Sequence, residues 1–264
     1  MFDSYLKLWS LTPDGNPIET HSSRLLPVRR GDAPAMLKIA LHAEEERGAY
    51  LMDWWQGQGA AHVFEREGNA ILLERAVGEA SLQQFVAQGD DDQASRIICE
   101  VAALLHAPQT APHPECVPLE IWFRDLEPAA RHHGGILSHC SSTASELLAY
   151  PQDITLLHGD IHHANILDFG VRGWLTIDPK GLIGERGFDF ANLFCNPDLE
   201  TALVPGRLAR QVEIVAEAAQ LERRRLLQWI LAWSGLSAVW MVQDGMNATQ
   251  QLAVAELAAA ELAR

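Results

Sequence analysis

The sequence has few of the features that mark disulfide-rich, zinc-binding or membrane-spanning proteins. Its four cysteines stand at positions 99, 116, 140 and 195, and no two of them form a C-x-x-C pair. This spacing suits neither a disulfide scaffold nor a zinc site, and it is typical of the reducing cytoplasm. The first residues lack the apolar stretch of a signal peptide. The longest apolar run, from Leu226 to Val242, is interrupted by polar residues and falls short of the roughly 20 residues of a bilayer span, so it predicts a buried core helix.

Positive charge is also scarce. Only 20 Lys and Arg residues oppose 35 Asp and Glu residues, which gives a formal net charge of -15. Such a chain repels the phosphates of nucleic acid and of anionic lipid, so we expect neither nucleic acid nor a membrane among its partners. A cationic small molecule remains compatible with this charge. With 264 residues, 48% of them hydrophobic, the chain can form a core without disulfides or metals.

Residues 1–76 predict a small β-rich lobe. A Pro-Asp-Gly turn at positions 13–15 separates two runs and predicts a hairpin whose first strand covers residues 6–11. Turn residues and apolar patterning predict the remaining elements of this lobe. These are strands at 35–40, 61–64 and 70–73, and a helix at 44–57.

Residues 77–264 predict a larger helical lobe. Apolar residues at helical spacing predict helices at 81–88, 94–106, 118–131, 143–150 and from 207 onward. Trp229, Trp233 and Trp240 recur at this spacing and are expected in the core. Two short runs, 166–169 and 174–177, predict a β-hairpin within the lobe. The fold class is therefore α+β, with a cleft between two lobes, and we expect a monomer or a weak homodimer.

An acid, an amide and a second acid surround this hairpin. Asp160 precedes Asn165 by five residues, and Asp178 directly follows the second strand. The spacing from Asp to Asn is that of the kinase catalytic loop. Phosphoryl transfer needs a carboxylate that orients and deprotonates the attacking hydroxyl, and an amide and a carboxylate that hold Mg²⁺ on the nucleotide phosphates. We therefore interpret Asp160 as the catalytic residue and Asn165 and Asp178 as metal ligands.

Three motifs around these residues carry a family resemblance. They are H-G-D-x-x-x-x-N from His158, I-D-P from Ile177 and G-E-R-x-F-D-x-A-N from Gly184. Together they resemble the aminoglycoside phosphotransferases, and most of all the streptomycin kinase and hydroxyurea phosphotransferase type of antibiotic resistance kinase. The resemblance implies a protein-kinase-like two-lobed fold, ATP and Mg²⁺ as cofactors, and transfer of the γ-phosphoryl group to a hydroxyl of a small molecule such as streptomycin.

The same resemblance implies a nucleotide site in the first lobe. Lys38 matches the lysine that contacts the α- and β-phosphates, and Glu46 is the expected partner of that lysine, with Glu45 as the neighbouring candidate. Two further pairs complete the expected nucleotide contacts. The backbone groups of Glu74 and Ala76 are expected at the adenine edge, and Ser22 and Ser23 in the loop that covers the phosphates. No G-x-G-x-x-G motif is present, so hydroxyl and backbone donors would replace a glycine-rich loop.

The resemblance also implies supporting and acceptor-binding residues. Asp189 matches the acid that supports the catalytic loop, and His158 is expected to pack beneath that loop. His163, like its neighbour His162, is a candidate for the cleft wall. The acids expected to meet a cationic aminoglycoside are Glu127, Glu185, Asp198 and Asp244.

Three other readings of the residues remain open. The segment from His158 to His163 superficially resembles a zinc-hydrolase cluster, although no histidine follows His163 in the chain. A nucleotide-binding regulator of the same fold would bind ATP without turnover. A kinase of a metabolite would use the same catalytic residues on an acceptor that is not an antibiotic.

Overall fold

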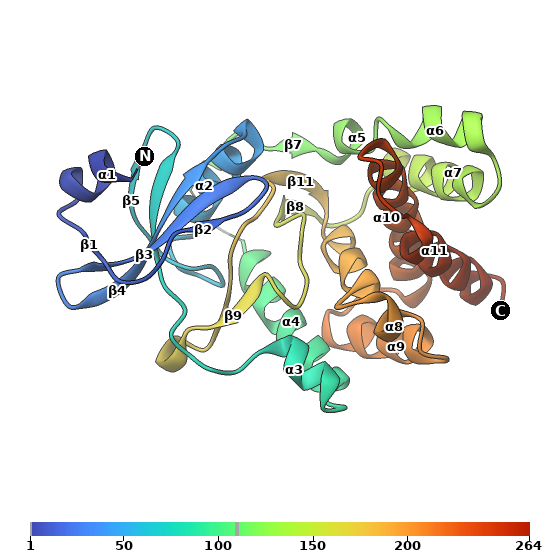
Figure 1. Cartoon of the computed structure of the whole chain (residues 1–264). Coiled ribbons are helices and arrows are strands. Elements are labelled where there is room, and N and C mark those ends of the chain that lie inside the picture. The colour runs from blue at the N-terminus through green and yellow to red at the C-terminus, as the bar shows by residue number, and fades with distance from the viewer. Residues whose placement is uncertain (1, 109–110) are drawn as a thin grey trace.

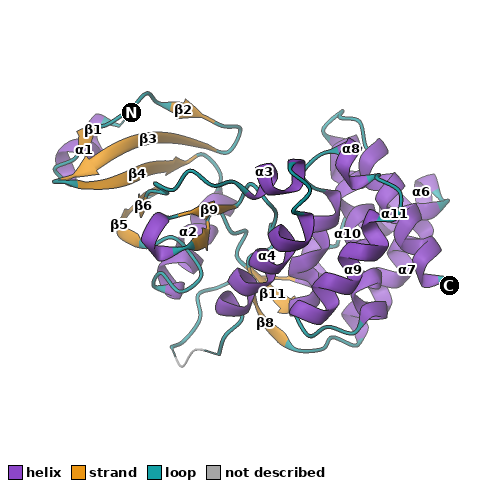
Figure 2. Cartoon of the chain, turned by 90° about the horizontal axis from the view of Figure 1, so that it is seen from below, coloured by secondary structure: helices purple, strands orange, loops and turns teal. Residues whose placement is uncertain are grey.

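The chain folds into two unequal lobes, in a computed structural model that describes residues 2–108 and 111–264. An antiparallel sheet dominates the N-terminal lobe, and helices dominate the C-terminal lobe (Figures 1 and 2). The predicted α+β organisation is therefore confirmed. The predicted division between residues 76 and 77 falls in the segment that joins the last strand of the sheet to the first helix of the second lobe.

The N-terminal sheet has the order β1-β3-β4-β6-β5, with β2 beside β3, and every pair in it is antiparallel. Its strands are β1 (Thr12–Pro13), β2 (Ile18–Glu19), β3 (Ser23–Arg30), β4 (Ala33–Ala40), β5 (Val63–Glu67) and β6 (Ala70–Glu74). Val28, Leu37 and Leu72 are fully buried on one face of this sheet. The central strand β4 places Lys38 opposite Leu25 of β3 and Ile71 of β6.

The first predicted strand, at residues 6–11, is wrong. Residues Asp3–Leu8 form the helix α1, and β1 and β2 pair with β3 rather than with each other. The apolar residues Phe2, Tyr5, Leu6 and Trp9 pack against the buried cluster of the sheet. Their spacing is that of one helical face, so the segment follows the helical period and not the alternation of a strand.

Helix α2 (Ala43–Trp55) connects the cores of the two lobes. Its Ala49 and Met52 pack in a cluster with the sheet, whereas its Leu51 and Trp55 belong to the large core of the C-terminal lobe. The indole Nε1 of Trp55 donates a hydrogen bond to the carbonyl of Leu105, at 3.2 Å. One helix is thus buried against both lobes, and it fixes their relative position.

The long helix α10 lies at the centre of the C-terminal lobe, where it packs against α6, α7, α9, α11 and η2 (Figure 1). Its helices are α3 (Leu82–Ala87), α4 (Asp91–Leu105), α5 (Leu119–Trp122), α6 (Leu126–His133), α7 (Ile136–Ala149), α8 (Leu199–Ala202), α9 (Arg207–Ala218), α10 (Arg223–Gln243) and α11 (Thr249–Leu262), with 3-10 segments η1 (Gly170–Arg172) and η2 (Arg186–Cys195). Helix α10 has the length and apolar composition of a membrane span, but 67% of that stretch is buried inside the lobe. The predicted core helix is confirmed.

The predicted helix at 118–131 is two helices, α5 and α6. Proline disrupts a helix interior because it lacks the N–H donor and its ring meets the preceding turn, but the first turn tolerates it. Pro128 lies in the first turn of α6, so a break before Leu126 accommodates it.

Short strands surround the loop between Leu157 and Ile166. The predicted hairpin is confirmed as β9 (Ile166–Asp168) and β10 (Trp174–Thr176), which pair in antiparallel fashion. A second small sheet, which the sequence did not reveal, joins β7 (Val117–Pro118), β11 (Leu182–Glu185) and β8 (Ile154–Leu157). The two sheets hold both ends of the loop that carries Asp160.

The lobes are in close contact where α2 meets the segment Asp178–Gly181. A Cβ atom added to Gly48 would lie only 2.0 Å from the carbonyl oxygen of Pro179, and one added to Gly181 would lie 3.3 Å from the Cβ atom of Arg47. Glycine at these two positions therefore permits a backbone contact that any larger residue would push apart.

We expect Gly48→Ala to destabilise the protein. The added methyl group must displace either α2 or Pro179, which costs about 1–3 kcal/mol and outweighs the roughly 1 kcal/mol that alanine gains in a helix. Glu46→Ala, an exposed change in the same helix, serves as the matched control for helix propensity. Urea unfolding of both variants measures the difference, and equal stability of the two would contradict the close contact.

Candidate active site

The loop between β8 and β9 is held from below by one buried carboxylate. Asp189 of η2 is 1% exposed and accepts hydrogen bonds from the backbone N–H groups of His158, at 2.9 Å, and Gly159, at 2.6 Å. Its Oδ2 also lies 2.8 Å from Nε2 of His106. Gly159 has φ +84, a left-handed conformation that favours glycine. This turn projects Asp160 out of the core.

His158 is fully buried beneath the same loop. Its Nδ1 accepts the N–H of Asp160 at 3.1 Å, and its Nε2 lies 2.8 Å from the carbonyl of Ile177 and 2.7 Å from Oγ1 of Thr176. Burial lowers the pKa of His158 and keeps the ring neutral. Both ring nitrogens are thus occupied by the protein, which argues against the zinc-hydrolase interpretation.

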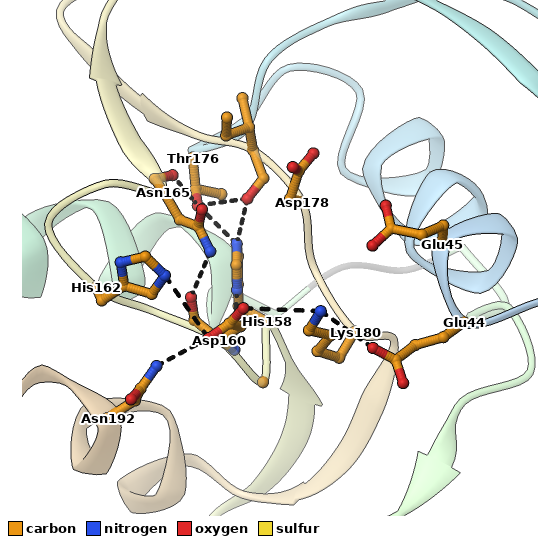
Figure 3. Close-up of polar contacts among 12 residues, drawn as sticks. Glu44, Glu45, His158, Asp160, His162, Asn165, Thr176, Asp178, Lys180 and Asn192 are labelled. Carbon is orange, nitrogen blue, oxygen red and sulfur yellow. Dashed lines mark hydrogen bonds and ion pairs between the residues drawn. The ribbon is translucent and has the colours of Figure 1, made fainter. Parts of the chain in front are cut away.

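The carboxylate of Asp160 is one-quarter exposed and meets three side chains (Figure 3). Asn192 of η2 donates a hydrogen bond from Nδ2 to Oδ1, at 2.8 Å. Nε2 of His162 lies 3.8 Å from the same Oδ1, and Nζ of Lys180 lies 3.7 Å from Oδ2. One oxygen is therefore fixed by an amide, while the other faces a cation.

Asn165 and Asp178 flank the β9–β10 hairpin. The amide nitrogen of Asn165 donates to the carbonyl of Asp160, at 2.9 Å, which turns the amide oxygen the other way. Asp178 adopts φ +60 and presents Oδ1 to Nζ of Lys38, at 2.8 Å. One amide oxygen and one carboxylate form an all-oxygen donor set, which suits Mg²⁺ because that ion takes few protein ligands and completes its shell with phosphate oxygens and water.

The expected partner of Lys38 was wrong by one residue. Lys38 is 4% exposed, and its ammonium pairs with Glu45 of α2 and with Asp178, whereas Glu46 is exposed. Consecutive residues of a helix are turned by about 100° from each other, so only one of the two acids can face β4. Lys38 thereby joins the sheet, helix α2 and the segment after the hairpin.

The other nucleotide-site candidates lie along the edge of the N-terminal lobe. Ser22 and Ser23 lie at the turn between β2 and β3, where Ser23 is buried and its hydroxyl lies 3.0 Å from Oγ1 of Thr20. Glu74 ends β6 and directs its carboxylate to Arg172, and Ala76 follows in the segment that joins the lobes.

A cavity of about 710 Å³ opens beside Asp160, between α2, α5 and α10. Trp122, Trp233 and Trp240 form one wall, and the rings of Trp122 and Trp240 meet edge to face with centroids 5.1 Å apart. The acids on this wall are Asp125 and Asp244. The cavity is large enough for a drug-sized molecule, and its lining combines acids and aromatic faces, which attract cations, with the cationic Arg47, Arg124 and Lys180.

Among the acceptor-site candidates, only Asp244 lines this cavity. The prediction that Glu185 binds the acceptor is wrong. Its carboxylate is buried and accepts hydrogen bonds from Arg225 and Trp229, at 2.6–2.8 Å. Asp198 caps α8 by accepting the N–H of Thr201, at 2.8 Å, and does not line the cavity.

The two remaining candidates, Glu127 and His163, also lie outside the cavity lining. Glu127 is exposed on α6 and pairs with Arg131 one turn later. His163 is 2% exposed, and burial together with the nearby Arg207 lowers its pKa to about 4. His163 was expected near the site because it follows Asp160 by only three residues. In the structure the loop between β8 and β9 directs its ring into the protein.

Several site residues were missed at the level of the sequence. The motif that contains Asn192 does not indicate a role for this residue. The helical spacing of Trp233 and Trp240 predicts only that they lie in the core. Trp233 also donates from Nε1 to Oδ1 of Asn192, at 3.1 Å, so the cavity wall connects to Asp160 through one amide. A detectable signal was the polar sequence around these tryptophans, where Ser237 and Asp244 interrupt the apolar face.

The two lobes, with the loop that presents Asp160 at the cleft, have the arrangement of the protein-kinase-like fold. A solved structure of the amicoumacin kinase hAmiN, in complex with AMP-PNP, Ca²⁺ and Ami, matches this fold with a TM-score of 0.64. The two chains are 12% identical, and the match covers 98% of this chain and 92% of that one.

The family follows from closer relatives. The family model described as aminoglycoside/hydroxyurea antibiotic resistance kinase matches residues 8–245, and the chain belongs to this family. It is 49% identical to a streptomycin 3''-kinase of Klebsiella pneumoniae over 98% of both chains. It is 30% identical to a streptomycin 6-kinase of Streptomyces griseus, over 94% of this chain and 85% of that protein. The family expected from the sequence motifs is confirmed.

We expect Glu45→Gln and Glu46→Gln to differ sharply. The first removes one carboxylate from a buried ammonium, so the KM for ATP should rise about tenfold and the thermal midpoint should fall. The second changes an exposed side chain and should leave both unchanged. Steady-state kinetics and thermal unfolding of the two isosteric variants measure these effects. A larger effect of Glu46→Gln would contradict the pairing of Lys38 with Glu45.

Proposed function

We propose that this protein transfers the γ-phosphoryl group of ATP to the 3''-hydroxyl of streptomycin. The observation that carries the proposal is the 49% identity to a streptomycin 3''-kinase over 98% of both chains. The 30% identity to a streptomycin 6-kinase supports the same acceptor with a different hydroxyl, so the position of transfer is the finer part of the proposal. Such a reaction inactivates the antibiotic by adding a dianionic group to it.

In the proposed reaction Asp160 is the general base. Asn192 fixes its Oδ1, and because Asp160 lines the cavity, Oδ2 is the oxygen proposed to orient the acceptor hydroxyl. The hydroxyl oxygen forms a bond to the γ-phosphorus, the bond to the bridging oxygen of ADP breaks, and the hydroxyl proton passes to Asp160. His158 and Asp189 act through the backbone of the loop, which they hold in place.

Asn165 and Asp178 are the residues that would hold Mg²⁺. The amide oxygen and the carboxylate lie on opposite flanks of the hairpin, and the backbone N–H of Ile177 bonds to the carbonyl of Asn165 at 2.9 Å. This bond fixes the two ligands relative to each other. When bound, Mg²⁺ neutralises charge on the nucleotide phosphates.

Lys38 is proposed to contact the α- and β-phosphates from the sheet. Its buried ammonium is paired with Glu45 and Asp178. The hydroxyls of Ser22 and Ser23, at the β2–β3 turn, are the proposed donors above the phosphates. In this division residues 1–76 bind the nucleotide, and residues 77–264 supply the catalytic loop and the acceptor cavity.

The acceptor is proposed to bind in the 710 Å³ cavity beside Asp160. Asp125 and Asp244 supply negative charge, and Trp122, Trp233 and Trp240 supply aromatic faces to a polycationic aminoglycoside. The active form is proposed to be a monomer or a weak homodimer. A reaction that consumes ATP, in a protein with four free cysteines, fits the cytoplasm.

The central test is product formation from streptomycin. We expect Mg²⁺-dependent release of ADP with streptomycin, and a phosphorylated product whose phosphorus couples to the 3'' proton in nuclear magnetic resonance spectra. Hydroxyurea, other aminoglycosides and sugar alcohols serve as comparison acceptors. Turnover with a sugar alcohol alone would favour the metabolite kinase, and ATP binding without any turnover would favour the regulator.

Two substitutions separate the base from the metal ligand. Asp160→Asn should lower kcat about 10³-fold and leave the Kd for ATP within about twofold, because its contact with the hydroxyl matters in the transition state. Asp178→Ala should instead abolish the Mg²⁺-dependent part of nucleotide binding, measured by calorimetry. Near-normal turnover of Asp160→Asn would remove Asp160 from the catalytic role, and unchanged binding by Asp178→Ala would move the metal elsewhere.

A further inference from the structure

Lysine is rare in this chain, and two of its lysines are at the active site. Only three of the 20 Lys and Arg residues are lysines, namely Lys7, Lys38 and Lys180. Lys7 is exposed on α1, far along the sequence from the catalytic loop. An ammonium is a compact point charge, whereas a guanidinium is a broad planar fork. The preference for arginine elsewhere makes the ammonium of Lys180, next to Asp160, a feature that requires an explanation.

Lys180 lies between the two lobes (Figure 3). Its Nζ is 3.0 Å from Oε1 of Glu44 on α2 and 3.7 Å from Oδ2 of Asp160 on the catalytic loop. Its side chain is 23% exposed and lines the acceptor cavity. The ammonium can therefore be reached from the cavity while two carboxylates hold it.

The backbone of Lys180 is fixed as well. Its N–H donates a hydrogen bond to the carbonyl of His158, at 2.7 Å. On either side, Pro179 touches Gly48 and Gly181 touches Arg47, so the segment is pressed against α2. The position of the ammonium is thus determined by the same contacts that place the catalytic loop, which is the preorganisation that electrostatic catalysis requires.

The charge of Lys180 is secured by its neighbours. Burial alone lowers the pKa of Lys180, but Asp160 and Glu44 together raise it above the ordinary value. The ammonium thus lies between two carboxylates, and one of them is the proposed general base.

The two oxygens of Asp160 have different surroundings. Oδ1 accepts the amide of Asn192 and lies near His162, whereas Oδ2 faces Lys180. A hydroxyl bound to Oδ2 must have the γ-phosphorus within about 3–3.5 Å of its oxygen before attack. Nζ lies only 3.7 Å from Oδ2, so the ammonium and a hydroxyl bound to Oδ2 would share the surroundings of one oxygen.

We propose that Lys180 is a further catalytic residue, whose ammonium contacts a non-bridging oxygen of the γ-phosphoryl group during transfer. The inference rests on the proposed function. As the acceptor oxygen bonds to phosphorus and the bond to the bridging oxygen of ADP breaks, the hydroxyl proton moves to Asp160. Lys180 neither gains nor loses a proton; it offsets the charge of the transferring group. Glu44 is a positioning residue that holds the ammonium from the other lobe.

The competing explanation is that Lys180 only joins the lobes through Glu44. A structural ion pair of this kind would affect stability and the binding of both substrates, because it would set the width of the cleft. A contact made with the transferring group affects kcat and leaves ground-state binding nearly unchanged. The split between kcat and KM therefore distinguishes the two roles.

The experiment compares Lys180→Met, Lys180→Arg, Glu44→Gln and the surface control Lys7→Met in the full chain. Each is assayed for transfer to streptomycin and for slow hydrolysis of ATP without acceptor, and its Kd for ATP is measured separately. Lys180→Met should lower kcat about 100-fold in both assays, with Kd for ATP and KM for streptomycin within about threefold. Lys180→Arg should recover part of the loss, Glu44→Gln should lower kcat about tenfold, and Lys7→Met should match the parent.

Several results would overturn the inference. One is a kcat of Lys180→Met within twofold of the parent in both assays, and another is an unchanged kcat with a raised KM for either substrate. If Lys180→Met fails to fold, Glu44→Gln decides, because it retains the ammonium but loses its support, and an unchanged kcat would contradict the proposal. If the parent acts on an acceptor other than streptomycin, the proposed function changes, and the hydrolysis assay still determines the role of Lys180.

Discussion

The geometry of the site depends on one buried carboxylate, that of Asp189. Two backbone N–H groups of the turn at His158 and Gly159 point into the protein interior, where they cannot reach water. Leaving such donors unpaired costs about 1–3 kcal/mol each, so the carboxylate that accepts them also determines the path of the loop. Asp160 is exposed to the cavity because the residues just before it are fixed. A flexible loop could carry the same side chains, but it could not hold them in one arrangement.

Helix α2 provides the second constraint, since it carries acids that reach into both halves of the site. Glu45 pairs with Lys38 of the sheet, and Glu44 pairs with Lys180 of the catalytic lobe. The helix also buries Trp55 in the larger core. A displacement of α2 would therefore change the nucleotide side and the acceptor side of the cleft together. This coupling lets the two substrates of one reaction be positioned by a single rigid element.

Much of the fold and the centre of the site could be predicted, because both follow local patterns. The spacing from Asp160 to Asn165 is a property of one short loop, and the hairpin beyond it consists of two short, mainly apolar runs joined by a segment that begins and ends with glycine. The predictions were wrong where the direction of a side chain depends on how the elements pack against each other. The rotation of α2 selects Glu45 over Glu46, and a tryptophan such as Trp240 faces both the core and a cavity, which no apolar count can separate. Glu185 shows the opposite case. The sequence predicts that this acid can bind the acceptor, but in the structure it is paired with Arg225, which lies 40 residues further along the chain.

The distribution of lysine has a practical consequence for labelling. Lys38 is almost fully buried between two carboxylates, and Lys180 is held as a cation by two others. Reagents that acylate amines need the neutral, accessible form, so on the side chains they should react first at Lys7. That residue lies on α1, which packs on the sheet at the end of the N-terminal lobe remote from α10 (Figure 1). A dye or a tether attached there would report on the molecule, or fix it to a surface, without entering the cleft.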